Sequence, residues 1–133
     1  LNSSEKLSCQ PLGAGVVALL PDHHCGVGET ARILRYLADS SARQCGPCLF
    51  GLDDLAALME RVADGSNRRG DLRRIERFSA QIVGRGGCHH PDGAVRMLAS
   101  ALEVFSRDVH AHTKQGRCRH SLGHTLVPIP EAV

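Results

Sequence analysis

The chain has 133 residues, which is the size of about one domain. Hydrophobic residues make up 42% of it but aromatic residues only 3%, so its core must be aliphatic, which favours a small helical domain over a β-sandwich. The formal charge of +2 is too small to indicate nucleic-acid binding. No apolar run approaches the roughly 18 residues that a membrane span requires, so we expect no direct membrane insertion.

The first part of the chain predicts one strand and little else. Residues 14–20 form a short aliphatic and β-branched run that ends at Pro21, as expected of a buried strand near 15–20. This run lacks the basic flank of a signal peptide. Because the chain begins with Leu1 rather than Met, we expect it to be a fragment or a processed chain.

Four stretches with helical spacing of apolar residues follow. We expect helices at about 27–39, 52–64, 71–83 and 92–112, each with one apolar face. Such helices on short connections predict a mainly α fold, an up-down four-helix bundle over 26–113, with the short strand before it and an extended or disordered tail over 114–133. Four histidines, at positions 23, 24, 110 and 112, are expected to be exposed.

The alternation of helix direction predicts where the cysteines gather. The first and third connections must share one end of the bundle, and they contain Cys45, Cys48 and Cys88. Cys25 and Cys118 fall at the opposite end, where we expect them close enough together to form a disulfide in oxidised preparations.

The three cysteines in the connections have a pattern typical of a soft metal centre. Cys45 and Cys48 have C-x-x-C spacing before one helix and Cys88 precedes another, so two positive helix N-termini would stabilise thiolates there. Cysteines are often buried as small hydrophobic residues, but three in glycine-rich loops at one end are harder to explain in that way.

The neighbours of these cysteines suit the same interpretation. Gly46 and Gly87 would let backbone amides approach the sulfurs, and Pro47 would stiffen the turn. With no targeting or membrane segment evident, we expect a cytoplasmic protein, in which six cysteines are thiols or metal ligands rather than a disulfide framework.

These motifs resemble a known family. The first is Ser41-Ala42-Arg43-Gln44-Cys45-Gly46-Pro47-Cys48, followed by Gly51. It resembles the iron–sulfur-binding domain of the NADH-binding flavoprotein (F) subunit of respiratory complex I and of related NAD-linked hydrogenase and formate dehydrogenase subunits. In that family a Ser-Cys-Gly-x-Cys-x-Pro-Cys loop supplies three ligands to a 4Fe–4S cluster, and a fourth cysteine follows on a loop before the last helix. The second motif, which matches that loop, is Cys88-His89-His90-Pro91-Asp92-Gly93-Ala94-Val95.

The resemblance covers about residues 12–112 and departs from the family at one ligand. Ala42 occupies the position of the first cysteine, so only Cys45, Cys48 and Cys88 carry over. The nearest residues that could replace the missing thiolate are His89 and His90, and a Cys3His set is compatible with zinc or with a cluster. Residues 1–25, which include Leu12-Gly13-Ala14-Gly15, resemble the end of the β-grasp domain that precedes the helical domain in the family.

The resemblance implies an electron-transfer domain of a complex I-like NADH oxidoreductase. Its iron–sulfur cluster, of the 4Fe–4S type, would be held by Cys45, Cys48, Cys88 and His89. The expected partners are a flavin- and NADH-binding domain or subunit and a further redox subunit. No sequence resembling a flavin or NADH site is present, so we expect no enzyme activity from this chain on its own. The alternative is a structural or protein-interaction bundle that holds zinc or no metal.

Overall fold

The computed structural model describes residues 17–120 and 126–129. Within these residues the chain is mainly helical, as its composition predicted, and contains no β-strand. The elements in chain order are α2 (Gly26–Asp39), the π-helical turn η1 (Pro47–Gly51), α3 (Leu52–Asp64), α4 (Asp71–Ile82), α5 (His90–Val104) and α6 (Ser106–Gln115).

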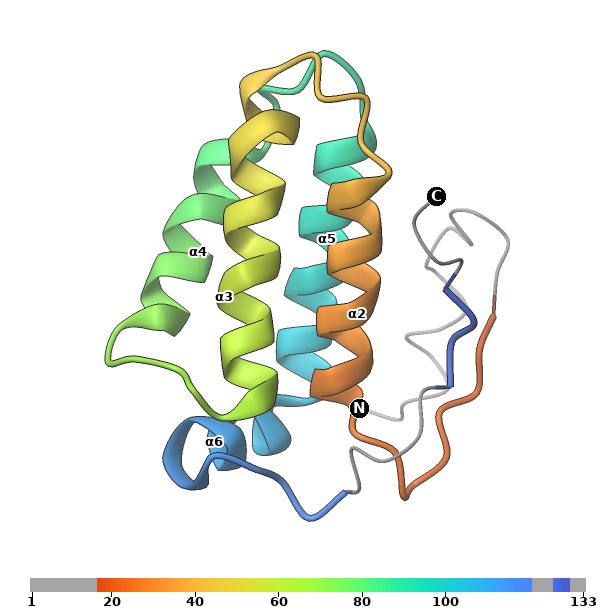
Figure 1. Cartoon of the computed structure of the whole chain (residues 1–133), viewed down its shortest axis with the longest axis vertical. Helices are drawn as coiled ribbons and strands as arrows, with labels where there is room; N and C mark the ends of the chain where they lie inside the picture. Colours follow the sequence, from red (N-terminus) through yellow and green to blue (C-terminus); the bar gives the residue numbers. More distant parts are fainter. Residues whose placement is uncertain (1–16, 121–125, 130–133) are drawn as a thin grey trace, which may run out of the picture.

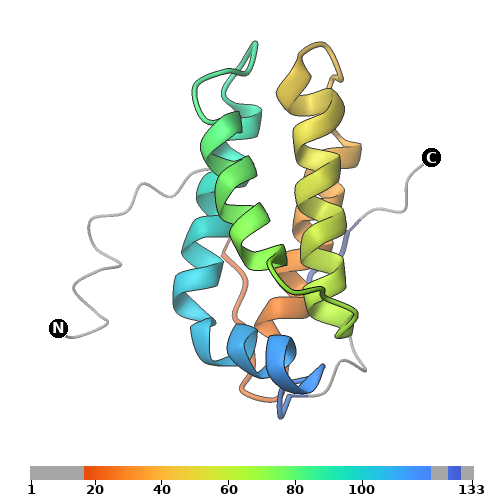
Figure 2. The ribbon, with the colours of Figure 1, turned by 90° about the vertical axis from the view of Figure 1, so that its left-hand side faces the viewer.

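Helices α2, α3, α4 and α5 lie side by side, and each runs in the opposite direction to the one before it (Figure 1). The connection from α2 to α3 and the connection from α4 to α5 therefore lie at the same end of the molecule. Helix α6 lies across the other end, beneath α3 and α4 (Figure 2). In the described part of the chain, no helix is both long and apolar enough to cross a membrane.

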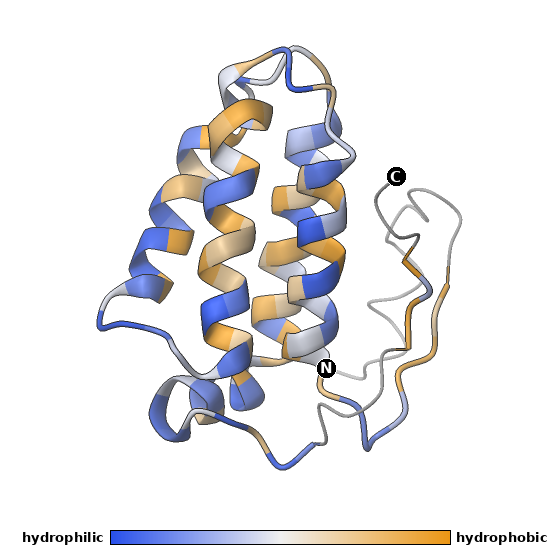
Figure 3. Cartoon of the chain, viewed as in Figure 1, coloured by the Kyte–Doolittle hydropathy of each residue, from blue (hydrophilic) through white to orange (hydrophobic). Residues whose placement is uncertain are grey.

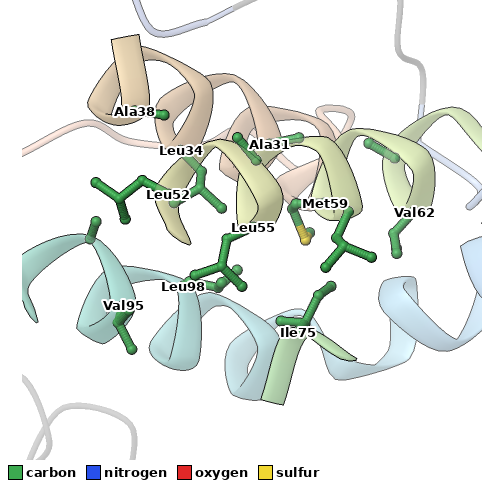
Figure 4. Close-up of a cluster of buried hydrophobic side chains, with 14 of the residues drawn as sticks. Ala31, Leu34, Ala38, Leu52, Leu55, Met59, Val62, Ile75, Val95 and Leu98 are labelled. Atoms are coloured by element: carbon green, nitrogen blue, oxygen red, sulfur yellow. The ribbon is translucent and has the colours of Figure 1, made fainter. Parts of the chain in front are cut away.

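The core forms around α3, which contributes side chains along its whole length. Its buried residues include Leu52, Leu55, Met59 and Val62. Side chains of α2, α4 and α5 point toward these residues (Figure 4). Along each helix, apolar segments alternate with polar ones, as expected when one face is buried (Figure 3). The core residues contributed by the neighbouring helices include Ala31, Leu34, Ala38, Ile75, Val95 and Leu98.

The expected strand near 15–20 is absent from its described part. Residues 17–20 have no regular structure, and Val17 and Leu19 are 70% and 85% exposed rather than buried. Residues 14–16 lie outside the described residues. A strand needs a neighbour for its backbone hydrogen bonds, and the described residues offer no other strand to pair with.

The single helix expected at 92–112 is in fact two helices. Helix α5 begins at His90 and ends at Val104, and α6 starts at Ser106. Phe105 lies between them with φ −96° and ψ 23°, outside the helical region. Its ring is seated against α2 at Gly26, where a Cβ would collide with it. The apolar spacing continues across Phe105, so the spacing alone could not reveal this break.

We expect Leu98→Ala to lower the free energy of unfolding by about 2–5 kcal/mol, because the Leu98 side chain is 0% exposed and its removal leaves a cavity. Chemical denaturation followed by circular dichroism measures this change. Val104→Ala on the same helix is the matched control, since Val104 is 70% exposed and should change stability by less than about 0.5 kcal/mol. Equal effects of the two substitutions would contradict the packing of α5.

Candidate metal centre

The C-x-x-C loop leads without a break into α3. Pro47 stands in the first turn of η1, where its missing N–H leaves no hydrogen bond unmade, and η1 continues directly into α3. The carbonyl of Cys45 accepts from the Leu49 N–H at 2.9 Å. The Cys45 backbone therefore satisfies one of the N–H groups at the start of this helix.

The second loop acts on the same sulfur. The backbone of Gly87, which directly precedes Cys88, and then that of Cys48 hold the pKa of the Cys45 thiol below its ordinary value. Both loops at this end of the bundle thus contribute backbone groups that favour a thiolate at Cys45.

The other two thiols of this end differ in their surroundings. Cys48 is only 3% exposed, and burial raises the pKa of its thiol, with further contributions from the neighbouring Cys45 and from the charge of Cys88. The Ser41 side chain opposes this shift. Cys88 is exposed. Cys45, Cys48 and Cys88 thus influence one another, although their sulfurs do not all lie within 4.8 Å of each other.

The two histidines that follow Cys88 are not equivalent. His90 Nε2 lies 2.8 Å from the carbonyl oxygen of Leu37 near the end of α2, so this ring is already engaged. The His89 side chain is fully exposed, and its Nδ1 lies 3.9 Å from the Asp92 carboxylate. Of the two, His89 is the one free to turn toward the sulfurs. Ala42 is exposed and contributes no donor.

The glycines of the site separate into two kinds. A Cβ on Gly46 or Gly87 would meet nothing within 4 Å, so open space adjoins the backbone at both glycines. A Cβ on Gly51 would come within 2.8 Å of the Ile82 side chain, and one on Gly86 within 2.8 Å of the Cys88 carbonyl. Gly51 and Gly86 are therefore required for close packing, whereas Gly46 and Gly87 border room that a bound group could occupy.

Arg43 has a backbone conformation that is unusual for its type. Its φ is +52°, the only positive φ of a non-glycine residue in the described part of the chain. This conformation costs an L-residue about 1–2 kcal/mol. An ion pair from Arg43 to Asp53, at 3.0 Å, offsets part of this cost. The family motif has glycine at the position of Arg43. The loop therefore keeps the left-handed backbone conformation that glycine adopts easily, although arginine stands in its place.

The comparisons with known proteins agree with this geometry. Residues 25–112 match the family described as the NADH-ubiquinone oxidoreductase-F iron-sulfur binding region. The chain belongs to this family. This match confirms the resemblance inferred from the motifs, and with it the assignment as an iron–sulfur-binding region of the complex I type whose cofactor is a 4Fe–4S cluster. The family match favours this assignment over a zinc-binding or metal-free structural bundle.

Individual relatives support the same assignment. The chain is 30% identical over 101 residues to the F subunit of NADH-quinone oxidoreductase of Salmonella typhimurium, covering 74% of this chain and 23% of the relative. It is 26% identical over 107 residues to the F subunit of the same enzyme of Mycobacterium tuberculosis, which covers 80% of this chain and 24% of that relative. It is also 23% identical over 107 residues to the HndC subunit of the NADP-reducing hydrogenase of Solidesulfovibrio fructosivorans, which covers 80% of this chain and 22% of that relative. The chain thus spans about a quarter of the length of these relatives.

The residues present fit three corners of such a cluster. Iron–sulfur clusters take thiolate ligands, and the backbone groups of Gly87 and Cys48 lower the pKa of the Cys45 thiol and so favour its thiolate form. In a cubane each thiolate binds a different iron, so the three sulfurs need not approach one another as closely as around a single tetrahedral zinc ion, where they would stand about 3.8 Å apart. The fourth corner has no cysteine, because Ala42 stands in its place.

The opposite end of the molecule holds the other pair of described cysteines. Cys25 Sγ and Cys118 Sγ lie 3.5 Å apart as free thiols, which confirms that these two residues approach each other. The expectation that His112 is exposed is wrong, because this ring is 0% exposed and its Nε2 lies 3.2 Å from Cys25 Sγ. Its position three residues after the buried Val109, on the same helical face, could have revealed this.

We expect Cys45 to be alkylated faster than Cys48 in the metal-free protein at neutral pH. A lowered pKa gives Cys45 the larger thiolate fraction at any pH below its ordinary pKa, whereas burial raises the pKa of Cys48 and shields it. Iodoacetamide labelling mapped by mass spectrometry measures both rates on the same sample. Preferential labelling of Cys48 would contradict the lowered pKa of the Cys45 thiol.

Proposed function

We propose that this chain holds a 4Fe–4S cluster between the α2–α3 and α4–α5 connections and serves as an electron-transfer domain of a complex I-like NADH oxidoreductase. The observation that carries the proposal is that both connections lie at one end of the helices (Figure 1), where the backbone of Gly87 in one connection lowers the pKa of the Cys45 thiol in the other. When bound, an iron–sulfur cluster supplies one-electron oxidation and reduction.

Cys45, Cys48 and Cys88 are the proposed thiolate ligands, and His89 is the proposed fourth ligand. His89 is preferred to His90 because the His90 ring is held by the Leu37 carbonyl. The backbone of Gly46, Pro47 and Gly87 would line the bound group. The open space beside Gly46 and Gly87 supports this role.

The residues around the sulfurs would tune the potential. Backbone groups that favour a thiolate, such as that of Gly87, stabilise the more negative, reduced state and so raise the potential. A neutral imidazole in place of a thiolate acts in the same direction, because it removes one negative charge. Cys88 is exposed and Cys48 is buried, so electrons would exchange with a partner on the Cys88 side.

The proposed partners are a flavin- and NADH-binding domain or subunit and a further redox subunit. The curated relatives are named as subunits, and they extend well beyond the region that this chain spans. Within this proposal the chain is part of an enzyme rather than an enzyme by itself. It consists of the end of a β-grasp-like domain (1–25), an up-down bundle (26–113) and a tail (114–133), in a cytoplasmic setting that suits free thiols.

We expect Cys88→Ser to lose most of the iron that the wild-type chain retains after anaerobic reconstitution. The matched control is Cys25→Ser, which removes a cysteine from the other end and should leave the iron content unchanged. Iron and acid-labile sulfide analysis of the desalted proteins measures both. The reverse pattern, in which Cys25→Ser loses the iron and Cys88→Ser keeps it, would overturn the proposal.

Restoring the missing cysteine should make the centre more resistant to air. We expect Ala42→Cys to slow the loss of cluster absorbance in air by about tenfold or more, because even outer-shell changes alter metal affinity by about 10–100-fold. Gln44→Cys is the control, since it adds a thiol to the same exposed loop at a position where the family motif has no ligand. Equal protection by both substitutions would show that Ala42 does not mark the missing ligand position.

A further inference from the structure

A second group of metal-binding side chains lies at the opposite end of the helices from the cluster site. It consists of Cys25, His112 and Cys118, whose ligand atoms all lie within 4.8 Å of one another. Among the described residues it is the one set of three or more histidine, cysteine or acidic side chains that meets this distance. We propose that these three residues form a zinc site that fastens the segment after α6 to the start of α2.

The donor set and its spacing suit one zinc ion. Tetrahedral zinc with Zn–S bonds of about 2.3 Å and Zn–N bonds of about 2.0–2.1 Å separates two thiolates by about 3.8 Å and a thiolate from an imidazole nitrogen by about 3.6 Å. The Cys25 and Cys118 sulfurs lie 3.5 Å apart, and Cys25 Sγ lies 3.2 Å from His112 Nε2. For these two pairs an ion requires movements of only a few tenths of an ångström, and the donor atoms of His112 and Cys118 lie within 4.8 Å of each other. Thiolate with imidazole is a donor set that zinc prefers.

The His112 ring presents Nε2 to the sulfurs. It is completely buried, and its Nδ1 has no hydrogen-bond partner of standard geometry among the described residues. Backbone carbonyls of Val62 and Ala63, at the end of α3, lie close to the ring. A proton on Nδ1, directed toward this backbone, would leave the Nε2 lone pair directed at the sulfurs. Metal-binding histidines commonly direct their second ring nitrogen at a backbone carbonyl in this way.

One backbone contact of Cys25 would stabilise its thiolate once a cation is bound. Cys25 is the N-cap of α2, and its sulfur accepts the Gly28 N–H at 3.3 Å. Without a cation, burial is the main reason that the pKa of this thiol rises to about 11, so the group stays neutral. Zinc binding would displace the protons of both thiols into solvent and leave a neutral centre of one ion, two thiolates and one imidazole. Cys118 is half-buried, which leaves the fourth position open to water.

The site differs from the cluster site in place and in kind. The three ligands come from the start of α2, from α6 and from the segment after α6, so one ion would connect elements at both ends of the described chain. The family match begins at Cys25 and ends at His112, so Cys118 lies beyond it. The close spacing of the donors suits a single ion, whereas cubane thiolates bind different irons and stand farther apart.

The test uses the full chain with Cys45, Cys48 and Cys88 all changed to serine, so that the cluster site cannot bind metal. Under reducing conditions we expect this variant to bind one Co²⁺ per chain with sulfur-to-cobalt charge-transfer absorption, and zinc to displace the cobalt. Adding Cys118→Ser should lower the affinity by at least about tenfold. Absence of cobalt binding by the folded background variant would overturn the proposal, as would unchanged affinity after Cys118→Ser.

Two further measurements test the site without the Cys118→Ser variant. His112→Gln should weaken cobalt binding, whereas His110→Gln should not, because His110 is exposed on the same helix. In the unaltered chain, zinc should protect Cys25 and Cys118 from alkylation, with labelling mapped by mass spectrometry. Equal labelling of these two cysteines with and without zinc would overturn the proposal, and so would equal effects of the two histidine substitutions.

Discussion

Burial of α3 among α2, α4 and α5 is the constraint on which the rest of the structure depends. Leu52, Leu55, Met59 and Val62 are almost completely excluded from solvent. To bury the apolar side chains on several sides of α3, the neighbouring helices pack beside it in alternating directions. This arrangement brings the α2–α3 and α4–α5 connections to one end (Figure 1). Hydrophobic packing therefore positions the thiols of both ends.

The two ends use the same local device. Cys25 and Cys45 each precede a helix, and the backbone of the residue three positions later, Gly28 and Cys48 respectively, acts to lower the pKa of each thiol. The result differs because of burial and neighbours. Burial and the adjacent Cys118 keep the pKa of the Cys25 thiol high, whereas the backbone of Gly87 also acts on Cys45 and its pKa is lowered. The backbone at the Cys45 end thus favours a thiolate in the absence of metal, whereas the thiols at the Cys25 end need a bound cation before they ionise.

Much of the helical structure could be predicted because apolar residues recur with the period of a helix. The bounds of α3 agree with the prediction over 52–64, and the approach of Cys25 to Cys118 followed from helix direction alone. The break at Phe105 could not be predicted, because it depends on the fit of one ring against Gly26, which is distant in sequence. The burial of His112 was missed because composition describes histidine as polar, although its helical position places it inside.

The motif indicated which residues form the proposed cluster site, but only the structure shows how they contact one another. The effect of the Gly87 backbone on Cys45 links residues far apart in the sequence, and the strain at Arg43 arises from a turn that the loop retains without its glycine. We propose a cluster with three thiolate ligands and one ligand of another kind. Mössbauer spectroscopy of the chain reconstituted with ⁵⁷Fe and sulfide distinguishes this ligand set from four thiolates. We expect one iron site distinct from the thiolate-bound irons of the cluster, and a spectrum with four equivalent thiolate-bound irons, or with no cluster, would contradict the proposed ligand set.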